Sequence, residues 1–123
     1  MKFESMWNAA VTNTHQDHVI AHVIGASVLR YFVWDETAYL LLDIGFIWNI
    51  YLDAEMGLLP ETLALAELNV DENLRQWEEI SSPSPIQSVD VFESEDGRRL
   101  ILNCENSSIA LETSFTTREI HVS

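Results

Sequence analysis

The sequence predicts an α+β fold in which an antiparallel sheet of four to six strands packs against short helices. β-branched and aromatic residues dominate two long apolar runs in residues 19–53, which is typical of a long two-stranded hairpin. Short alternating segments separated by turn residues fill 88–122, and apolar residues recur at helical spacing in 3–13 and 61–80. Because no strand-helix-strand alternation recurs, a parallel sheet is not expected. A length of 123 residues predicts one domain over residues 1–123.

The N-terminal segment has the pattern of a short amphipathic helix. Apolar residues recur at intervals of three and four residues from Phe3 to Val11, which brings them to one helical face. We therefore expect a helix over residues 3–13.

The register of the hairpin over 19–53 follows from its apolar pattern. If Trp34 pairs with Tyr39, one face of the hairpin becomes almost entirely apolar. The other face then carries Arg30 directly opposite Asp43. Since a slip of one residue would mix the two faces, we expect this register.

The same register places Trp48 over Gly25, where the indole would cover exposed glycine backbone. By periodicity, Trp48 and Trp77 belong to the core.

The segment 61–80 has helix-forming residues after Pro60, which suits a first helical position. Asp71 is typical of an N-cap, so the segment is either two short helices or one kinked helix. The serine- and proline-rich residues 81–85 end it and act as a connector within the domain.

The last third of the chain is predicted to be a β-meander. Alternating residues run through 88–92 and again from Leu100 to Cys104, and a final strand runs through Ile120 and Val122. The tetrapeptide 95–98 contains Asp-Gly, which favours a type I′ turn with positive φ values.

The charge is strongly acidic. Twenty Asp and Glu residues against six Lys and Arg residues give a net charge of -14, and no basic residue lies between Arg30 and Arg75. Such a field repels nucleic acid and anionic membranes, and it attracts a basic protein or a cation. We therefore expect a protein partner that is basic, with no nucleic acid and no membrane.

The location expected for this chain is the cytoplasm. Neither long apolar run reaches the roughly 20 clean residues of a membrane-spanning helix, and the first 18 residues contain no apolar signal region. The single Cys104 cannot form an internal disulfide, so nothing in the sequence requires an oxidising compartment.

Salt should stabilise a chain with this excess of like charge. We expect the melting temperature near pH 7 to rise between about 10 mM and about 500 mM sodium chloride, because salt screens repulsion among the carboxylates. Differential scanning calorimetry measures the shift. A melting temperature that does not respond to salt would show that the carboxylates are individually paired or well dispersed.

The four histidines of the chain are candidate metal ligands. His15, His18 and His22 would share one face of a helix, but on the predicted strand only His18 and His22 do so, about 13 Å apart. A structural role is therefore favoured, and no metal site or cofactor is expected. The alternative is a metal site in which His18, His22 and His121 converge near Asp43.

Arg30 has two interpretations. It could clamp an anion on the second face of the hairpin, or it could form an ion pair with Asp43. The ion pair is favoured because buried charges are normally paired.

The best candidate for a binding surface is the face beside the hairpin turn. Burial of Trp34 and Tyr39 in the core is the favoured interpretation. If no helix covers them, these two aromatic residues instead form a contact patch next to acidic turn residues. The candidate binding residues are Trp34, Tyr39, Asp35, Glu36, Arg30 and Asp43.

The sequence thus favours a small acidic, non-enzymatic protein-binding module, such as an inhibitor or immunity-like protein for a basic partner. The alternative is a small metal-dependent or carboxylate-using enzyme with a His/Asp site. A third possibility is a homodimer in which the apolar hairpin pairs across a two-fold axis.

Overall fold

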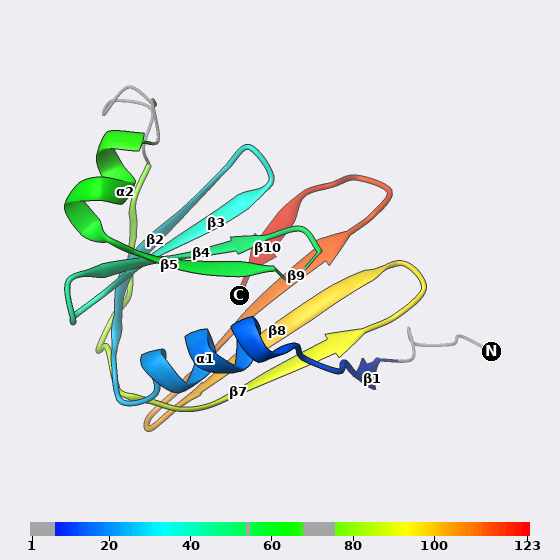
Figure 1. Cartoon of the computed structure of the whole chain (residues 1–123), viewed down its shortest axis with the longest axis horizontal. Helices are drawn as coiled ribbons and strands as arrows, with labels where there is room; N and C mark the ends of the chain where they lie inside the picture. The colour runs from blue at the N-terminus through cyan, green and yellow to red at the C-terminus, as the bar shows by residue number, and fades with distance from the viewer. Residues whose placement is uncertain (1–6, 54, 68–75) are drawn as a thin grey trace.

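The computed structural model describes residues 7–53, 55–67 and 76–123 of the chain (Figure 1). In these ranges the strands form two antiparallel sheets of five strands each, accompanied by two short helices. The predicted α+β class with antiparallel sheets is therefore confirmed, with the strands divided between two sheets.

The first sheet contains the predicted meander, which is confirmed. Its strand order is β1-β7-β8-β9-β10. The strands are β1 (Asn8–Ala9), β7 (Ile86–Glu93), β8 (Gly97–Cys104), β9 (Ser108–Ser114) and β10 (Ile120–Val122).

The second sheet has the order β5-β4-β3-β2-β6. The strands are β2 (Val28–Trp34), β3 (Thr37–Leu42), β4 (Phe46–Tyr51), β5 (Met56–Pro60) and β6 (Glu78–Glu79). The region 19–53 is therefore not one long hairpin, because the second apolar run is divided into β3 and β4. Gly45, with φ of 79°, lies in the turn between them.

The predicted register of the hairpin is wrong. Trp34 pairs with Thr37, and Arg30 pairs with Leu41 instead of Asp43. The turn contains only two residues because both adopt positive φ, whereas the prediction assumed a four-residue turn. From Arg30 to Trp34 the shift is two residues, so these residues stay on their predicted faces. A bulge between Val28 and Arg30 then brings Val28 to the same side of the sheet as Tyr31.

The predicted contact between Trp48 and Gly25 is also wrong. Trp48 pairs with Leu40 on one side and with Leu58 on the other. Gly25 follows a helix with φ of 89°, and nothing lies within 4 Å of the position that its Cβ would occupy. Its role is therefore to end the helix, not to accommodate an indole.

Helix α1 (Thr14–Val23) replaces the first part of the predicted strand. Asn13 and Gln16 form a capping box, each side chain accepting a hydrogen bond from the other residue's backbone N–H. Val19 and Val23 are four residues apart and buried, as one face of a helix requires. These local signals outweigh the strand preference of the β-branched residues.

The helix predicted over residues 3–13 is not found in its described part. Asn8–Ala9 form strand β1 against β7, and Ala10 donates a backbone hydrogen bond to Val91 at 2.8 Å. Residues 3–6 lie outside the described residues.

Helix α2 (Glu61–Glu67) confirms the start of the predicted segment 61–80. Glu78–Glu79 form strand β6 against β2 instead of helix. Residues 68–75, including the proposed N-cap Asp71, lie outside the described residues. Neither helix in the described ranges has the length and apolar character needed to cross a bilayer.

The second sheet is buried on both faces. One face packs with the first sheet and α1 in a core that includes Trp48, Leu102 and Val23. The opposite face packs Phe32 and Tyr39 with α2. The β2–β3 turn extends past this packing toward the connection between β9 and β10 (Figure 1).

Candidate protein-binding surface

The turn between β2 and β3 has an unusual backbone. Asp35 and Glu36 both adopt left-handed conformations, with φ of 51° and 63°, between the paired residues Trp34 and Thr37. Hairpin turns of this type usually use Asn-Gly, because other residues pay a steric cost for positive φ. Such strain persists where neighbouring contacts hold it in place, and it gathers at functional sites.

Arg118 holds the turn from the other sheet. Its guanidinium donates from Nε to Glu36 Oε1 at 2.5 Å and from Nη2 to Oε2 at 3.0 Å. Arg118 is itself left-handed, with φ of 59°, and its backbone N–H donates to Ser114 at 2.7 Å. The hydrogen bonds from Arg118, followed by its charge, lower the pKa of Glu36 below its ordinary value.

Removing Arg118 should therefore change the titration of Glu36. In Arg118→Gln we expect the pKa of Glu36 to rise toward 4.5, its ordinary value, as measured by NMR titration of the carboxyl carbon. Because folding lowers this pKa, the pair stabilises the fold above about pH 4.5, and the effect is lost as pH falls through the lowered value.

Arg99→Gln is the matched control for this titration, because Arg99 pairs instead with Glu112 at 3.4 Å. An unchanged pKa of Glu36 in Arg118→Gln would contradict the assigned cause.

Two open hollows flank the Glu36–Arg118 pair. The first, the Phe115 hollow, has a volume of about 550 Å³ and is lined by Asp35, Glu36, Thr37, Tyr51, Leu52, Asp53, Phe115 and Arg118. The second, the Trp34 hollow, has about 560 Å³ and is lined by Val33, Trp34, Asp35, Glu36, Thr117, Arg118, Glu119, Ile120 and His121. Both therefore combine apolar side chains with carboxylates.

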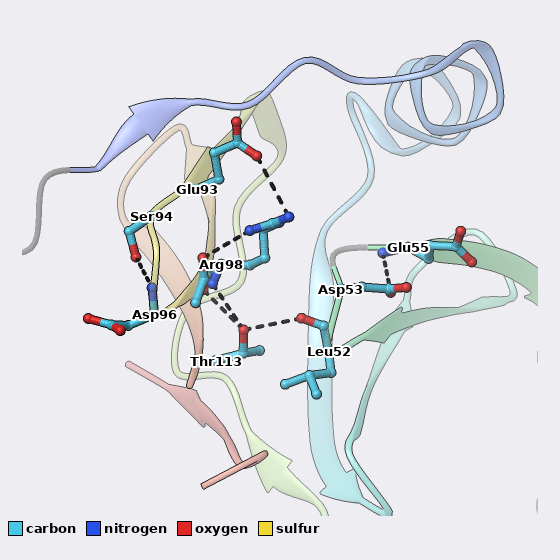
Figure 2. Close-up of polar contacts among 9 residues, drawn as sticks. Leu52, Asp53, Glu55, Glu93, Ser94, Asp96, Arg98 and Thr113 are labelled. Carbon is cyan, nitrogen blue, oxygen red and sulfur yellow. Dashed lines mark hydrogen bonds and ion pairs between the residues drawn. The ribbon is translucent and has the colours of Figure 1, made fainter. Parts of the chain in front are cut away.

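Polar contacts connect the first sheet with Leu52, which lines the Phe115 hollow (Figure 2). Thr113 on β9 donates from Oγ1 to the carbonyl oxygen of Leu52 at 3.2 Å, which ties the two sheets together. The Arg98 side chain forms an ion pair with Glu93 at 3.7 Å and lies over the Phe115 ring at 5.2 Å. The aromatic wall of the hollow is thus supported from the first sheet.

Exposed apolar side chains gather around these hollows. Nine large hydrophobic side chains in the described ranges are exposed, and four of them line a hollow. They are Val33 (39%), Trp34 (40%), Tyr51 (44%) and Phe115 (39%). Neighbouring exposed apolar side chains are typical of protein-binding surfaces, whereas isolated ones are ordinary.

The lining is also acidic. It contains the carboxylates of Asp35, Glu36, Asp53 and Glu119, and Arg118 is its one guanidinium. Since Arg118 is already paired with Glu36, the remaining carboxylates face solvent without a guanidinium partner from this lining. We call these residues the hairpin-tip surface: Val33, Trp34, Asp35, Glu36, Tyr51, Asp53, Phe115, Arg118 and Glu119.

No protein-family model, curated protein or solved structure matches this chain. The interpretation of the hairpin-tip surface therefore depends on its own properties: a strained turn, a cluster of exposed apolar side chains, and an excess of carboxylates.

Three of the predicted binding residues lie on the hairpin-tip surface, namely Trp34, Asp35 and Glu36. Tyr39 does not, because it stacks on Phe32 with ring centroids 4.8 Å apart and is 8% exposed. Burial raises the pKa of the Tyr39 hydroxyl.

The predicted pairing of Arg30 with Asp43 is wrong. The Arg30 guanidinium lies over the Trp77 ring at 4.7 Å, on the side of the sheet that α2 covers. Asp43 accepts a hydrogen bond from the backbone N–H of Ser27 at 3.0 Å. Both residues therefore have structural contacts away from the hairpin-tip surface.

The structure does not bring His18, His22 and His121 together. His18 and His22 lie on α1, where His22 contacts the Phe46 ring edge-on at 6.0 Å. His121 lies on β10, 3.7 Å from Glu119. The described residues contain no group of three or more His, Cys, Asp or Glu that could hold a metal ion.

Sequence reasoning missed the other six residues of the hairpin-tip surface, which are Val33, Tyr51, Asp53, Phe115, Arg118 and Glu119. Arg118 lies in the β9–β10 connection, and 82 positions separate it from Glu36 along the chain. No local pattern marks such a pair. One feature of the sequence could have drawn attention to Phe115. It follows directly after β9, so the alternation of buried and exposed residues along the strand does not explain an aromatic side chain there.

Proposed function

We propose that this chain is a small acidic, non-enzymatic protein-binding module that acts on a basic partner as an inhibitor or immunity-like protein would. The single observation that supports this most is the gathering of four exposed apolar side chains and four carboxylates on the hairpin-tip surface. Apolar side chains supply most of the affinity of an interface, and charge complementarity speeds association.

Trp34 is the proposed anchor. It is 40% exposed, it lines the Trp34 hollow, and the held turn at Asp35 and Glu36 follows it directly. A tryptophan on a pre-organised turn loses little conformational freedom when it binds, so its contact area contributes efficiently. The carboxylates around it would pair with Lys or Arg side chains of the partner.

The proposal includes a cytoplasmic location, in keeping with one cysteine and no need for an oxidising compartment. A homodimer is the competing expectation for this surface. It is disfavoured because two chains of net charge -14 would bring like-charged surfaces together.

Random peptides displayed on phage and selected against the purified protein test the proposal. We expect the selected peptides to carry net positive charge and apolar residues, and to bind less tightly as salt increases. Trp34→Ala should weaken their binding by about 30-fold, the effect of removing an interface anchor.

Leu63→Ala is the matched control, because Leu63 is similarly exposed at 47% but lies on α2. It should leave peptide affinity unchanged. Selected peptides that are neutral or acidic, or an equal loss in Leu63→Ala and Trp34→Ala, would count against the proposal.

A further inference from the structure

Strand β10 has a free edge. Ser123 and Ala110 exchange backbone hydrogen bonds at 2.8 and 2.9 Å, which sets the alternation of the β9–β10 ladder. His121 therefore bonds toward β9, whereas the backbone N–H and C=O groups of Ile120 and Val122 point away from it. No hydrogen bond from a described residue reaches these groups, and β10 is the last strand of its sheet.

Strand β2 of the other sheet also has an edge there to which no described residue pairs. Ile80 donates to the carbonyl oxygen of Leu29 at 3.0 Å, and β6 pairs with β2 at Arg30 and Tyr31 only. By the same alternation, Val33 has outward-pointing backbone groups beyond the end of β6. Val33 and Ile120 both line the Trp34 hollow, so two sheet edges that have no partner among residues 7–53, 55–67 and 76–123 border one hollow.

The side chains along this edge specify a pattern. Ile120 is 7% exposed and faces the core, so a residue added opposite it would meet an apolar face. His121 points to the other face of β10, where its Nε2 lies 3.7 Å from Oε2 of Glu119, the residue just before the strand. The next residue along the added strand would point to the opposite face and lie beside the Glu119 carboxylate.

The charge decides between a partner and a second copy of this chain. Asp35, Glu36 and Glu119 line the Trp34 hollow, and a second copy would place the same carboxylates next to them. A segment with basic side chains would instead be complementary to this lining.

We infer that the partner contributes an extended segment with alternating apolar and basic residues, which adds as a strand to the free edge of β10 beside the Trp34 hollow. This inference rests on the proposed function and specifies how the same surface recognises its partner. Backbone hydrogen bonds to Ile120 and Val122 supply affinity, and alternate side chains supply specificity.

A pair of synthetic peptides tests this mode of binding. The first is Lys-Val-Lys-Val-Lys-Val-Lys with blocked ends, and the second has proline in place of each valine. Both carry the same charge, but proline removes the N–H groups of one edge and disfavours the strand conformation. We expect the proline peptide to bind at least about tenfold more weakly by fluorescence anisotropy, because strand addition depends on backbone pairing.

Amide hydrogen exchange locates the bound strand. With the valine peptide bound, the amides of Ile120 and Val122 should exchange at least about tenfold more slowly, because they become hydrogen-bonded. The amide of Val11, a residue that is 95% exposed, serves as an internal control.

Val122→Pro removes an edge donor without removing a described hydrogen bond to β9. Val122→Pro should lower the affinity for the valine peptide about tenfold. Val122→Ala, which keeps the N–H, should change that affinity less than about threefold. Circular dichroism checks that both variants are folded, and slowed exchange at Ile120 and Val122 in the wild type tests the inference if either is not.

The outcomes separate this inference from the proposed function. Equal binding of the two peptides, or unprotected amides at Ile120 and Val122, would overturn strand addition while the Trp34→Ala assay still tests the proposed function. Failure of the valine peptide to bind would do the same. A concentration-dependent dimer that protects these amides without peptide would overturn the inference in favour of a second copy.

Discussion

Gly97→Ala is expected to destabilise the fold by about 3 kcal/mol, at the upper end of what overpacking usually costs. A Cβ at Gly97 would lie 2.0 Å from the carbonyl oxygen of Thr113 and 3.1 Å from its carbonyl carbon. Both are backbone atoms of the central β8–β9 pairing, so neither can rotate away. Urea denaturation followed by circular dichroism measures the loss.

Gly57→Ala provides the control for this substitution. Gly57 also lies within a strand, β5, but nothing lies within 4 Å of its Cβ position and its φ is not left-handed. Alanine there should be neutral or stabilise by up to about 1 kcal/mol, since it reduces the freedom of the unfolded chain. An equal loss in both variants would contradict the steric explanation.

Gly97 also shows how a correct prediction can have the wrong reason. The sequence predicts a hairpin turn at 95–98, and the chain does reverse there, since Glu93 pairs with Arg98. The predicted reason was a positive φ at Asp-Gly, but neither Asp96 nor Gly97 has one. The glycine is required because Thr113 of the neighbouring strand approaches it closely, and a single sequence contains no sign of that strand's position.

The strands in which apolar and polar residues alternate could be predicted from the sequence, whereas helix α1 could not. The meander over 88–122 has turn residues between short alternating segments, so its strands followed directly. Helix α1 was missed because Val19, Ile20 and Val23 favour strands by composition. The capping pair Asn13 and Gln16 was the decisive local signal.

The hairpin register shows the limit of face patterns. A shift of two residues leaves every side chain on the same face, so the apolar pattern cannot distinguish the predicted register from the observed one. The turn decides between them. Asp35 and Glu36 adopt φ values that are costly for residues other than glycine, so the sequence favoured a longer turn.

Sequence reasoning predicted three of the nine residues of the hairpin-tip surface. Trp34, Asp35 and Glu36 are consecutive, so a hairpin turn was enough to place them together. Phe115 and Arg118 come from the other sheet, and their approach depends on how the two sheets pack. The ion pair between Arg118 and Glu36 therefore follows only from the three-dimensional structure, in which the β2–β3 turn lies beside the β9–β10 connection (Figure 1).

Trp48→Ala should be as damaging as the change at Gly97, for the opposite reason. Trp48 is 0% exposed and lies on β4, which has a neighbouring strand on each side, and truncating a buried tryptophan costs about 3–5 kcal/mol. Its indole Nε1 is buried with no hydrogen-bond partner among the described residues, and losing that unpaired donor offsets part of the cost. We therefore expect a loss of about 3 kcal/mol, measured by urea denaturation.

Trp34→Ala is the matched comparison, since it removes the same side chain from an exposed turn. Trp34 is 40% exposed, so its truncation should cost less than about 1 kcal/mol while it abolishes most peptide binding. This opposite behaviour of two tryptophans distinguishes a residue that holds the fold from one that is available to a partner. If Trp34→Ala unfolds the protein as readily as Trp48→Ala does, the hairpin-tip surface belongs to the core and cannot be a docking site.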